Sequence, residues 1–123
     1  MDGLTWWDFD GMRVLRADYA LEDPFELLHA VIREVYNAPE SCVYEIIDFS
    51  HRTFPAGFIE EYKKFASEVV AKKQIICAYI GLIPEYFEIV REILDIVGTN
   101  VTTEFFDTEK AAITWLASFK DCK

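Results

Sequence analysis

The residues with the clearest chemical potential lie together in one short segment. Asp48, Ser50 and His51 are the three residue types of a catalytic triad, and Arg52 and Thr53 follow them directly. A triad needs side chains that converge from separated segments, whereas these are almost adjacent in the sequence. We therefore predict a turn in which Asp48 and Ser50 accept backbone N–H groups. Anion binding at the N-terminus of a following helix and catalysis remain alternatives.

The strand that positions this segment is predicted for residues 42–48, running into a loop at 49–50. Its residues are mostly β-branched or aromatic, as in packed strands. Each face is apolar except for one carboxylate, Glu45 on one side and Asp48 on the other, which favours an interior strand. Pro55 then suits the first turn of a helix. The loop after Gly81, at the end of a later strand, is a second candidate ligand or partner site, because ligands of open α/β sheets gather at the carboxyl ends of strands.

Other residue types give no sign of a metal or cofactor site. The chain has only two histidines, and we expect His29 to be solvated on a polar helix face. No cysteine spacing resembles a zinc ligand set, and there is no glycine-rich phosphate loop. The glutamates at 60, 61, 85, 88 and 92 fit solvated helix surfaces better than acid–base chemistry. We therefore expect no catalytic residues, no metal and no cofactor.

An antiparallel hairpin is predicted for residues 4–19, with Asp10-Gly11 as its two-residue turn. Trp6 and Trp7 point to opposite faces of the first strand. Only one of them can easily face a core, so the pair is a candidate for contact with a second copy or a partner. The sequence does not decide which of the two is exposed.

The remaining elements alternate between helix and strand. Asp23 and Pro24 open the first helix, Pro55 and Pro84 the next two, with Gly98 closing the third, and Asp107 caps the last. The buried stripes of these helices are predicted at Leu28, Val31, Ile32 and Val35; at Phe58, Tyr62, Phe65 and Val69, widened by Ile59, Ala66 and Val70; at Phe87, Val90, Leu94 and Val97; and at Ala112, Trp115, Leu116 and Phe119. The second helix is predicted for about residues 55–72, with Glu60, Glu61, Lys63, Lys64 and Glu68 facing water and Lys72 and Lys73 at its end.

With strands at 74–80 and 101–106, the order is ββαβαβαβα. This order predicts an α/β fold with a mixed, mainly parallel five-stranded sheet and right-handed crossovers. Polar residues on strand faces (Glu45, Asp48, Thr102 and Glu104) predict that one face of the sheet is incompletely covered.

Length, hydrophobic content, net charge and cysteine number limit the classes of protein to which this chain can belong. The 123 residues suit one domain, with a frayed tail at 120–123, and 52% are hydrophobic. A net charge of −10 disfavours nucleic acid and anionic membranes, because both present negative charge. Cys42 and Cys77 fit small core residues in a reducing compartment. No basic-then-apolar leader opens the chain, so we expect a cytoplasmic location.

Three patterns in this order resemble the SpoIIAA-like (STAS/CRAL-TRIO-related) domain family. They are VLRADY at 14–19, IIDFS at 46–50 and FDTEKAAITWL at 106–116. The resemblance implies strands in chain order with helices largely on one side. It also implies a mostly non-enzymatic role, as in anti-sigma-factor antagonists, regulatory domains and relatives that hold lipids; many members are bacterial. Where the antagonists carry a phosphorylatable serine, this chain has FPAG at 54–57, and neither Pro55 nor Ala56 has a hydroxyl.

The leading hypothesis is therefore a non-enzymatic regulatory or protein-interaction domain that contacts a protein partner or itself, as a homodimer. Nineteen aromatic residues are many for this length; most must belong to the core, but on an open sheet face some would form an apolar patch. The alternative is a domain that binds a small apolar ligand. A small enzyme using residues 48–53 is the third reading.

Overall fold

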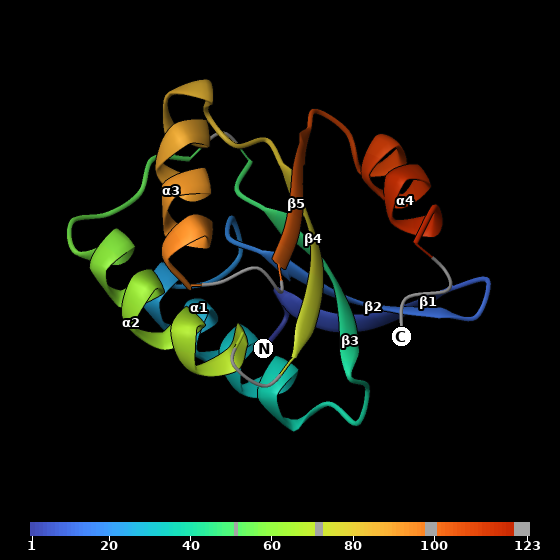
Figure 1. Ribbon diagram of the computed structural model, residues 1–123. Helices are drawn as coiled ribbons and strands as arrows, with labels where there is room; N and C mark the ends of the chain where they lie inside the picture. Colours follow the sequence, from blue (N-terminus) through green and yellow to red (C-terminus); the bar gives the residue numbers. More distant parts are fainter. Residues whose placement is uncertain (51, 71–72, 98–100, 120–123) are drawn as a thin grey trace.

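A single five-stranded sheet forms the centre of the molecule (Figure 1). The computed structural model describes residues 1–50, 52–70, 73–97 and 101–119. The strands are β1 (Leu4–Phe9), β2 (Met12–Asp18), β3 (Cys42–Asp48), β4 (Gln74–Ile80) and β5 (Val101–Phe106). They lie side by side in chain order, so the predicted ββαβαβαβα fold is confirmed, and the topology is consistent with the SpoIIAA-like arrangement.

The hairpin of β1 and β2 is antiparallel, and the other strand pairs are parallel. Asp10 and Gly11 both adopt positive φ, 52° and 84°, as a tight two-residue turn requires. The Asp8 side chain closes the turn by accepting the Gly11 N–H at 2.8 Å. The strongest local turn signal in the sequence thus sets the register, with Phe9 opposite Met12.

Three helices cover one face of the sheet and one helix covers the other, as Figure 1 shows. The first three are α1 (Pro24–Asn37), α2 (Phe58–Val70) and α3 (Phe87–Val97), and we call their side the three-helix face. The last is α4 (Glu109–Ala117), on what we call the α4 face. Parallel crossovers need a covering helix, but one helix on the α4 face leaves that side partly open, as predicted. The exposed residues Thr102 and Glu104 lie there on the edge strand β5.

The helix starts agree with the sequence in part. Asp23 caps α1 by accepting the N–H groups of Phe25 and Glu26 at 3.0 Å. The start predicted for the second helix at Pro55 is wrong, because Gly57 has a φ of +83° and α2 begins only at Phe58.

The other two helices start differently from the predictions as well. Pro84 opens a short 3₁₀ turn, η1 (Pro84–Tyr86), and α3 follows it. The cap of α4 is Thr108 rather than Asp107, since the Thr108 hydroxyl accepts the Ala111 N–H at 3.2 Å. In both places the predicted helix is present, and its start lies one to three residues later than predicted.

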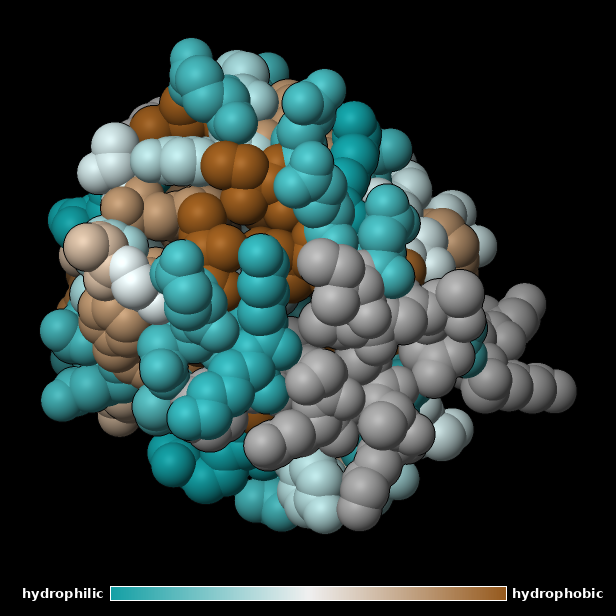
Figure 2. Space-filling model, turned by 60° about the vertical axis from the view of Figure 1, so that its left-hand side comes forward, coloured by the Kyte–Doolittle hydropathy of each residue, from teal (hydrophilic) through white to brown (hydrophobic). Residues whose placement is uncertain are grey.

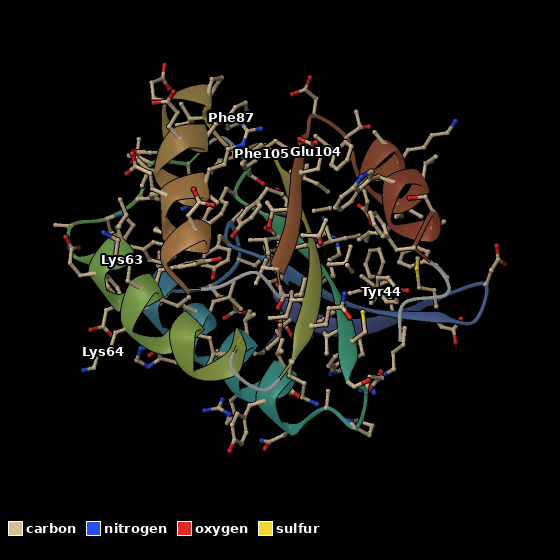
Figure 3. All side chains as sticks on the ribbon, viewed as in Figure 1. Tyr44, Lys63, Lys64, Phe87, Glu104 and Phe105 are labelled. Atoms are coloured by element: carbon tan, nitrogen blue, oxygen red, sulfur yellow. The ribbon has the colours of Figure 1, made fainter. Side chains whose placement is uncertain are left out.

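Stacked aromatic rings fix α3 over the edge strand. Figure 3 shows Phe87 of α3 beside Phe105 of β5, with ring centroids 4.3 Å apart. Arg91, one turn further along α3, lies over the Phe105 ring at 5.0 Å and 4.0 Å from a Glu104 oxygen. The outer end of the sheet is therefore held from the three-helix face.

The buried stripes are confirmed where the structure describes them. The residues from these stripes that are buried are Leu28, Val31, Val35, Phe58, Val90, Ala112 and Leu116. The half-buried ones are Ile32, Ile59, Tyr62, Phe87, Trp115 and Phe119. The predictions for the side chains of Phe65, Ala66, Glu68, Val69, Val70, Leu94 and Val97, and for His51, Lys72, Gly98 and the tail at 120–123, lie outside the described part.

The two cysteines in the described part of the chain, Cys42 and Cys77, are both buried. Cys77 is a free, buried thiol, as expected of a small core residue. Cys42 is buried as well but is disulfide-bonded, which corrects its expected state as a free core thiol. Within the described ranges, no helix is both long enough and apolar enough to span a bilayer.

Candidate ligand-binding cleft

A cleft of about 490 Å³ opens where β2 and β3 end, between the start of α1 and the start of α2. Its lining combines aromatic rings, two prolines and two polar side chains from the predicted site segment. The lining residues are Tyr19, Pro24, Phe49, Arg52, Thr53, Phe54, Pro55 and Phe58. Ligands of open α/β sheets gather at this end of the strands, so the cleft occupies the expected position.

Aromatic rings in contact with one another form the wall of the cleft. Tyr19 stacks on Phe49 with ring centroids 4.6 Å apart, and Phe54 stacks on Phe58 at 5.2 Å. Phe49 also meets the edge of Phe54 at 5.1 Å, which joins the two pairs. Rings packed in this way fill space rigidly. Tyr19, Phe49 and Phe58 are buried, and Phe54 is half-buried.

The wall continues into the groove between α2 and α3. Phe54 stacks on Tyr86 at 4.2 Å, and Phe49 stacks on Tyr79 of β4 at 5.9 Å. Figure 2 shows hydrophobic residues gathered near the centre of the face that carries α2 and α3, with hydrophilic residues around them. Within the aromatic cluster, Phe54 and Tyr86 are half-buried, whereas Phe49, Phe58 and Tyr79 are buried.

Hydrogen bonds within the segment 48–52 fix the loop that carries the cleft residues. The Ser50 N–H and hydroxyl both donate to one Asp48 oxygen at 2.9 Å, and the Arg52 N–H donates to the Phe49 carbonyl at 2.9 Å. The predicted Asp48 turn is therefore confirmed, although Ser50 donates hydrogen bonds there instead of accepting one. Ser50 has a φ of +49°, an unusual conformation for a non-glycine residue, which the Asp48 oxygen helps to stabilise.

The structure separates the predicted site residues into two groups. Arg52 and Thr53 line the cleft, whereas the Asp48 side chain turns to the α4 face and binds Arg16 at 2.9 Å. Gly81 is buried at the end of β4, and its N–H donates to the Phe106 carbonyl at 3.1 Å. Gly81 thus links β4 to β5 and is not part of the cleft. His51 lies outside the described residues.

An ion-pair cluster around Arg16 was not predicted from the sequence. The Arg16 guanidinium lies 2.9 Å from Asp48, 3.4 Å from Glu109 and 3.7 Å from Asp18. Its side chain is only 13% exposed, and within the described part of the chain its Nε has no hydrogen-bond partner. Asp48 and Glu109 are 32 and 93 positions from Arg16 in the sequence. The parallel register of β2 and β3 brings Asp48 to Arg16, and the position of α4 brings Glu109.

A second unpredicted feature is a buried carboxyl on the three-helix face. Glu45 pairs in register with Cys77 across β3 and β4, and the Cys77 thiol is hydrogen-bonded to it. Burial raises the pKa of Glu45 from 4.5 to about 7, and the thiol hydrogen bond opposes that rise. Glu45 therefore gives no evidence of an uncovered face, which corrects that part of the prediction. A lone glutamate in an apolar strand was the available signal.

Two phenols lie close to this carboxyl. The Tyr62 hydroxyl from α2 and the Tyr79 hydroxyl from β4 are 2.5 Å apart. Burial raises the pKa values of both, as it does for Tyr19. The polar atoms of this region thus pair with one another beneath the helices.

The fold decides which of Trp6 and Trp7 is exposed. Trp6 is half-buried against the three-helix core, with the Arg13 guanidinium 3.8 Å from its ring centroid. Trp7 is 36% exposed on the other side of β1 and lies 5.4 Å from the Phe9 ring. Trp7 is therefore the one of the pair that a partner can reach.

In the described ranges, no group of three or more His, Cys, Asp or Glu side chains has the arrangement to hold a metal ion. His29 is not simply solvated as expected, since its Nε2 lies 3.1 Å from a Glu61 oxygen and links α1 to α2. Comparison of the chain with protein-family models, curated proteins and solved structures finds no match in any of the three.

Proposed function

We propose that this domain is a non-enzymatic binding domain that holds a small, mainly apolar ligand in the cleft. The observation that carries this proposal is the cleft itself, about 490 Å³ with Tyr19, Phe49, Phe54 and Phe58 in its wall. Small-molecule sites are concave, mostly apolar and usually about 300–1,000 Å³ in volume. The cleft has this size, this composition and the expected position at the strand ends.

The polar groups near the cleft support binding rather than catalysis. Asp48 and Ser50, which would be needed for a triad, are bonded to each other, and Asp48 is also paired with Arg16. A general base must reach the proton that it removes, and Asp48 lies on the opposite face of the sheet from the cleft. The polar side chains that do line the cleft belong to Tyr19, Arg52 and Thr53.

A second candidate function is contact with a protein partner or a second copy, and Trp7 favours it. An exposed tryptophan on an edge strand is a frequent anchor in interfaces. Membership of the SpoIIAA-like family, a bacterial origin and a cytoplasmic location belong to this same proposal. The family membership is supported by the consistent topology and by the motifs of the sequence, whereas the disulfide-bonded Cys42 does not favour a reducing compartment.

The cleft proposal is tested with N-phenyl-1-naphthylamine, a neutral apolar dye whose fluorescence rises in an apolar site. We expect saturable binding to the wild type and binding about tenfold weaker to Thr53→Trp, because an indole would occupy part of the cleft. Thr53 is exposed, so the substitution leaves the core intact.

The matched control is Thr102→Trp, at another exposed threonine on β5 and away from the cleft. This variant is expected to bind the dye as the wild type does. Equal binding by Thr53→Trp and Thr102→Trp, or no saturable binding by the wild type, would contradict the proposal.

A further inference from the structure

Arg52 differs from three of the other four arginines, which pair with carboxylates. Arg13 pairs with Glu40 at 3.0 Å, Arg16 with Asp48, and Arg91 with Glu104. The Arg52 guanidinium instead donates to a backbone carbonyl, that of Ala20, at 3.4 Å, and it has no carboxylate partner in the described part of the chain. Arg33, exposed on α1, also has no carboxylate partner in that part of the chain, but of the two only Arg52 lines the cleft.

The hydrogen bond to Ala20 sets the position of this charge. It joins the loop after β3 to the loop before α1, which form opposite sides of the cleft. The guanidinium is therefore held at the entrance of an aromatic cleft, with further N–H groups available to a second acceptor.

Two carboxylates on the facing loop are close in sequence to Ala20 but are engaged elsewhere. A Glu22 oxygen accepts the Gly3 N–H at 2.6 Å, and an Asp23 oxygen accepts two N–H groups at the start of α1. The local arrangement thus leaves Arg52 without a neutralising carboxylate although candidates lie nearby.

We propose that the ligand of the cleft is an amphiphilic anion, whose apolar or aromatic body packs on Tyr19, Phe49, Phe54 and Phe58 and whose carboxylate, or similar acidic group, binds Arg52. This inference rests on the proposed function and adds the charge of the ligand to it. A guanidinium binds a carboxylate through two parallel N–H bonds, which fixes orientation as well as affinity. A net charge of −10 repels anions in general, so a local cation is required for such a ligand.

The experiment compares two probes of nearly equal shape, 2-naphthoate and 2-naphthamide, which differ in charge. Binding of each to the full chain is followed by NMR chemical shifts of the labelled protein. We expect the naphthoate to bind the wild type about tenfold more tightly than the naphthamide, because charge-assisted hydrogen bonds are about twice as strong as neutral ones. Arg52→Gln is expected to abolish this preference, and Arg52→Lys to retain part of it.

Arg33→Gln is the matched control. Arg33 is an exposed arginine on α1, nine residues beyond Pro24 and so about 13 Å along the helix from the cleft. The control has the same change of charge and is expected to keep the full preference.

Three results would decide against the proposal. Equal binding of the two probes to the wild type, or an equal loss of both in Arg52→Gln, overturns the inference and leaves the cleft a neutral apolar site. Equal loss of the preference in Arg33→Gln and Arg52→Gln also overturns it, because the effect would then come from net charge. If neither probe binds at millimolar concentration, both this inference and the proposed function fail.

Discussion

At the scale of single residues, the most unusual group is the buried carboxyl of Glu45. It is 8% exposed, with the Cys77 thiol as its hydrogen-bond partner. Folding raises its pKa from 4.5 to about 7, so the folded state binds a proton more tightly than the unfolded state. The direction of the pH effect follows from linkage.

Glu45 therefore predicts that the protein is less stable in mild alkali. Below about pH 4.5 the carboxyl is protonated in both states and costs nothing; as pH rises towards 7 and beyond, the unfolded state is increasingly favoured. The shift from 4.5 to about 7 corresponds to a loss of about 3 kcal/mol at about 1.4 kcal/mol per pKa unit. Urea denaturation between pH 5 and pH 8.5 measures this loss.

Glu45→Gln should remove this pH dependence, because the amide still accepts the thiol hydrogen bond but never ionises. We expect the variant to exceed the wild type in stability at pH 8.5 and to match it near pH 5. Glu104→Gln, at an exposed glutamate, is the control and should follow the wild-type curve. A wild-type stability that stays flat over this range would contradict the assignment.

The residue scale also shows where sequence reasoning succeeds. Asp48 was predicted to bond the backbone of its turn, and it does so because the donor is only two residues away. The same reasoning missed Arg16 as its partner, since the two residues are 32 positions apart and meet only through strand pairing. A contact between residues a few positions apart can be predicted from the sequence, whereas a contact between residues far apart in the chain depends on strand pairing.

At the scale of elements, the Arg16 cluster joins β2, β3 and the first turn of α4. Arg16 reaches Asp48 of β3 and Glu109 of α4 from its place on β2. The α4 face carries one helix only, so this polar junction supplements a smaller apolar contact around Ala112 and Leu116. We expect the junction to matter for the docking of α4.

Removal of Arg16 is predicted to destabilise the domain. Arg16→Gln leaves Asp48 and Glu109 partly buried without their cation, and breaking a buried pair in this way costs about 2–4 kcal/mol. Thermal or urea unfolding at pH 7 measures the effect. Arg13→Gln breaks a more exposed pair with Glu40 and should cost less than about 1 kcal/mol. Equal effects of the two substitutions would show that the buried cluster has no special role.

The ends of the elements show why boundaries are harder to predict than elements. The second helix was expected from Pro55, a residue suited to a first turn, but the positive φ of Gly57 excludes helix there. Glycine tolerates both signs of φ, so the sequence alone could not tell which one the chain adopts. Thr108 and Asp107 are both good capping residues, and the direction in which β5 ends selects Thr108.

At the scale of the whole molecule, the exposed side of the hairpin is a surface through which two copies could associate. β1 is an edge strand, and Trp7 beside Phe9 forms an apolar surface there. Unpaired edges offer free backbone N–H and C=O groups to another chain. We therefore propose this edge as the contact surface of the dimer suggested by the sequence.

The dimer proposal predicts a mass near twice 14.3 kDa by light scattering at high micromolar concentration. Trp7→Lys should shift the protein to monomer, because a charge on this side of an edge strand opposes pairing. Leu21→Lys, which replaces another exposed apolar residue in the loop between β2 and α1, is the control and should remain dimeric. A wild type that is monomeric throughout this range would refute the dimer.

The sequence by itself determined the order of the elements, the hairpin turn, the cap of α1 and the apolar stripes of the helices. Each of these depends on residues a few positions apart, such as Asp10 with Gly11 or Asp23 with Phe25. The tertiary structure alone decided that Trp7 rather than Trp6 is exposed, that Glu45 lies beneath three helices, and that Arg52 and Thr53 share a cleft with Tyr19 while Asp48 turns away. The physical reason is that parallel strands are joined by long crossovers, so neighbours in space are separated by 30 or so residues in the chain.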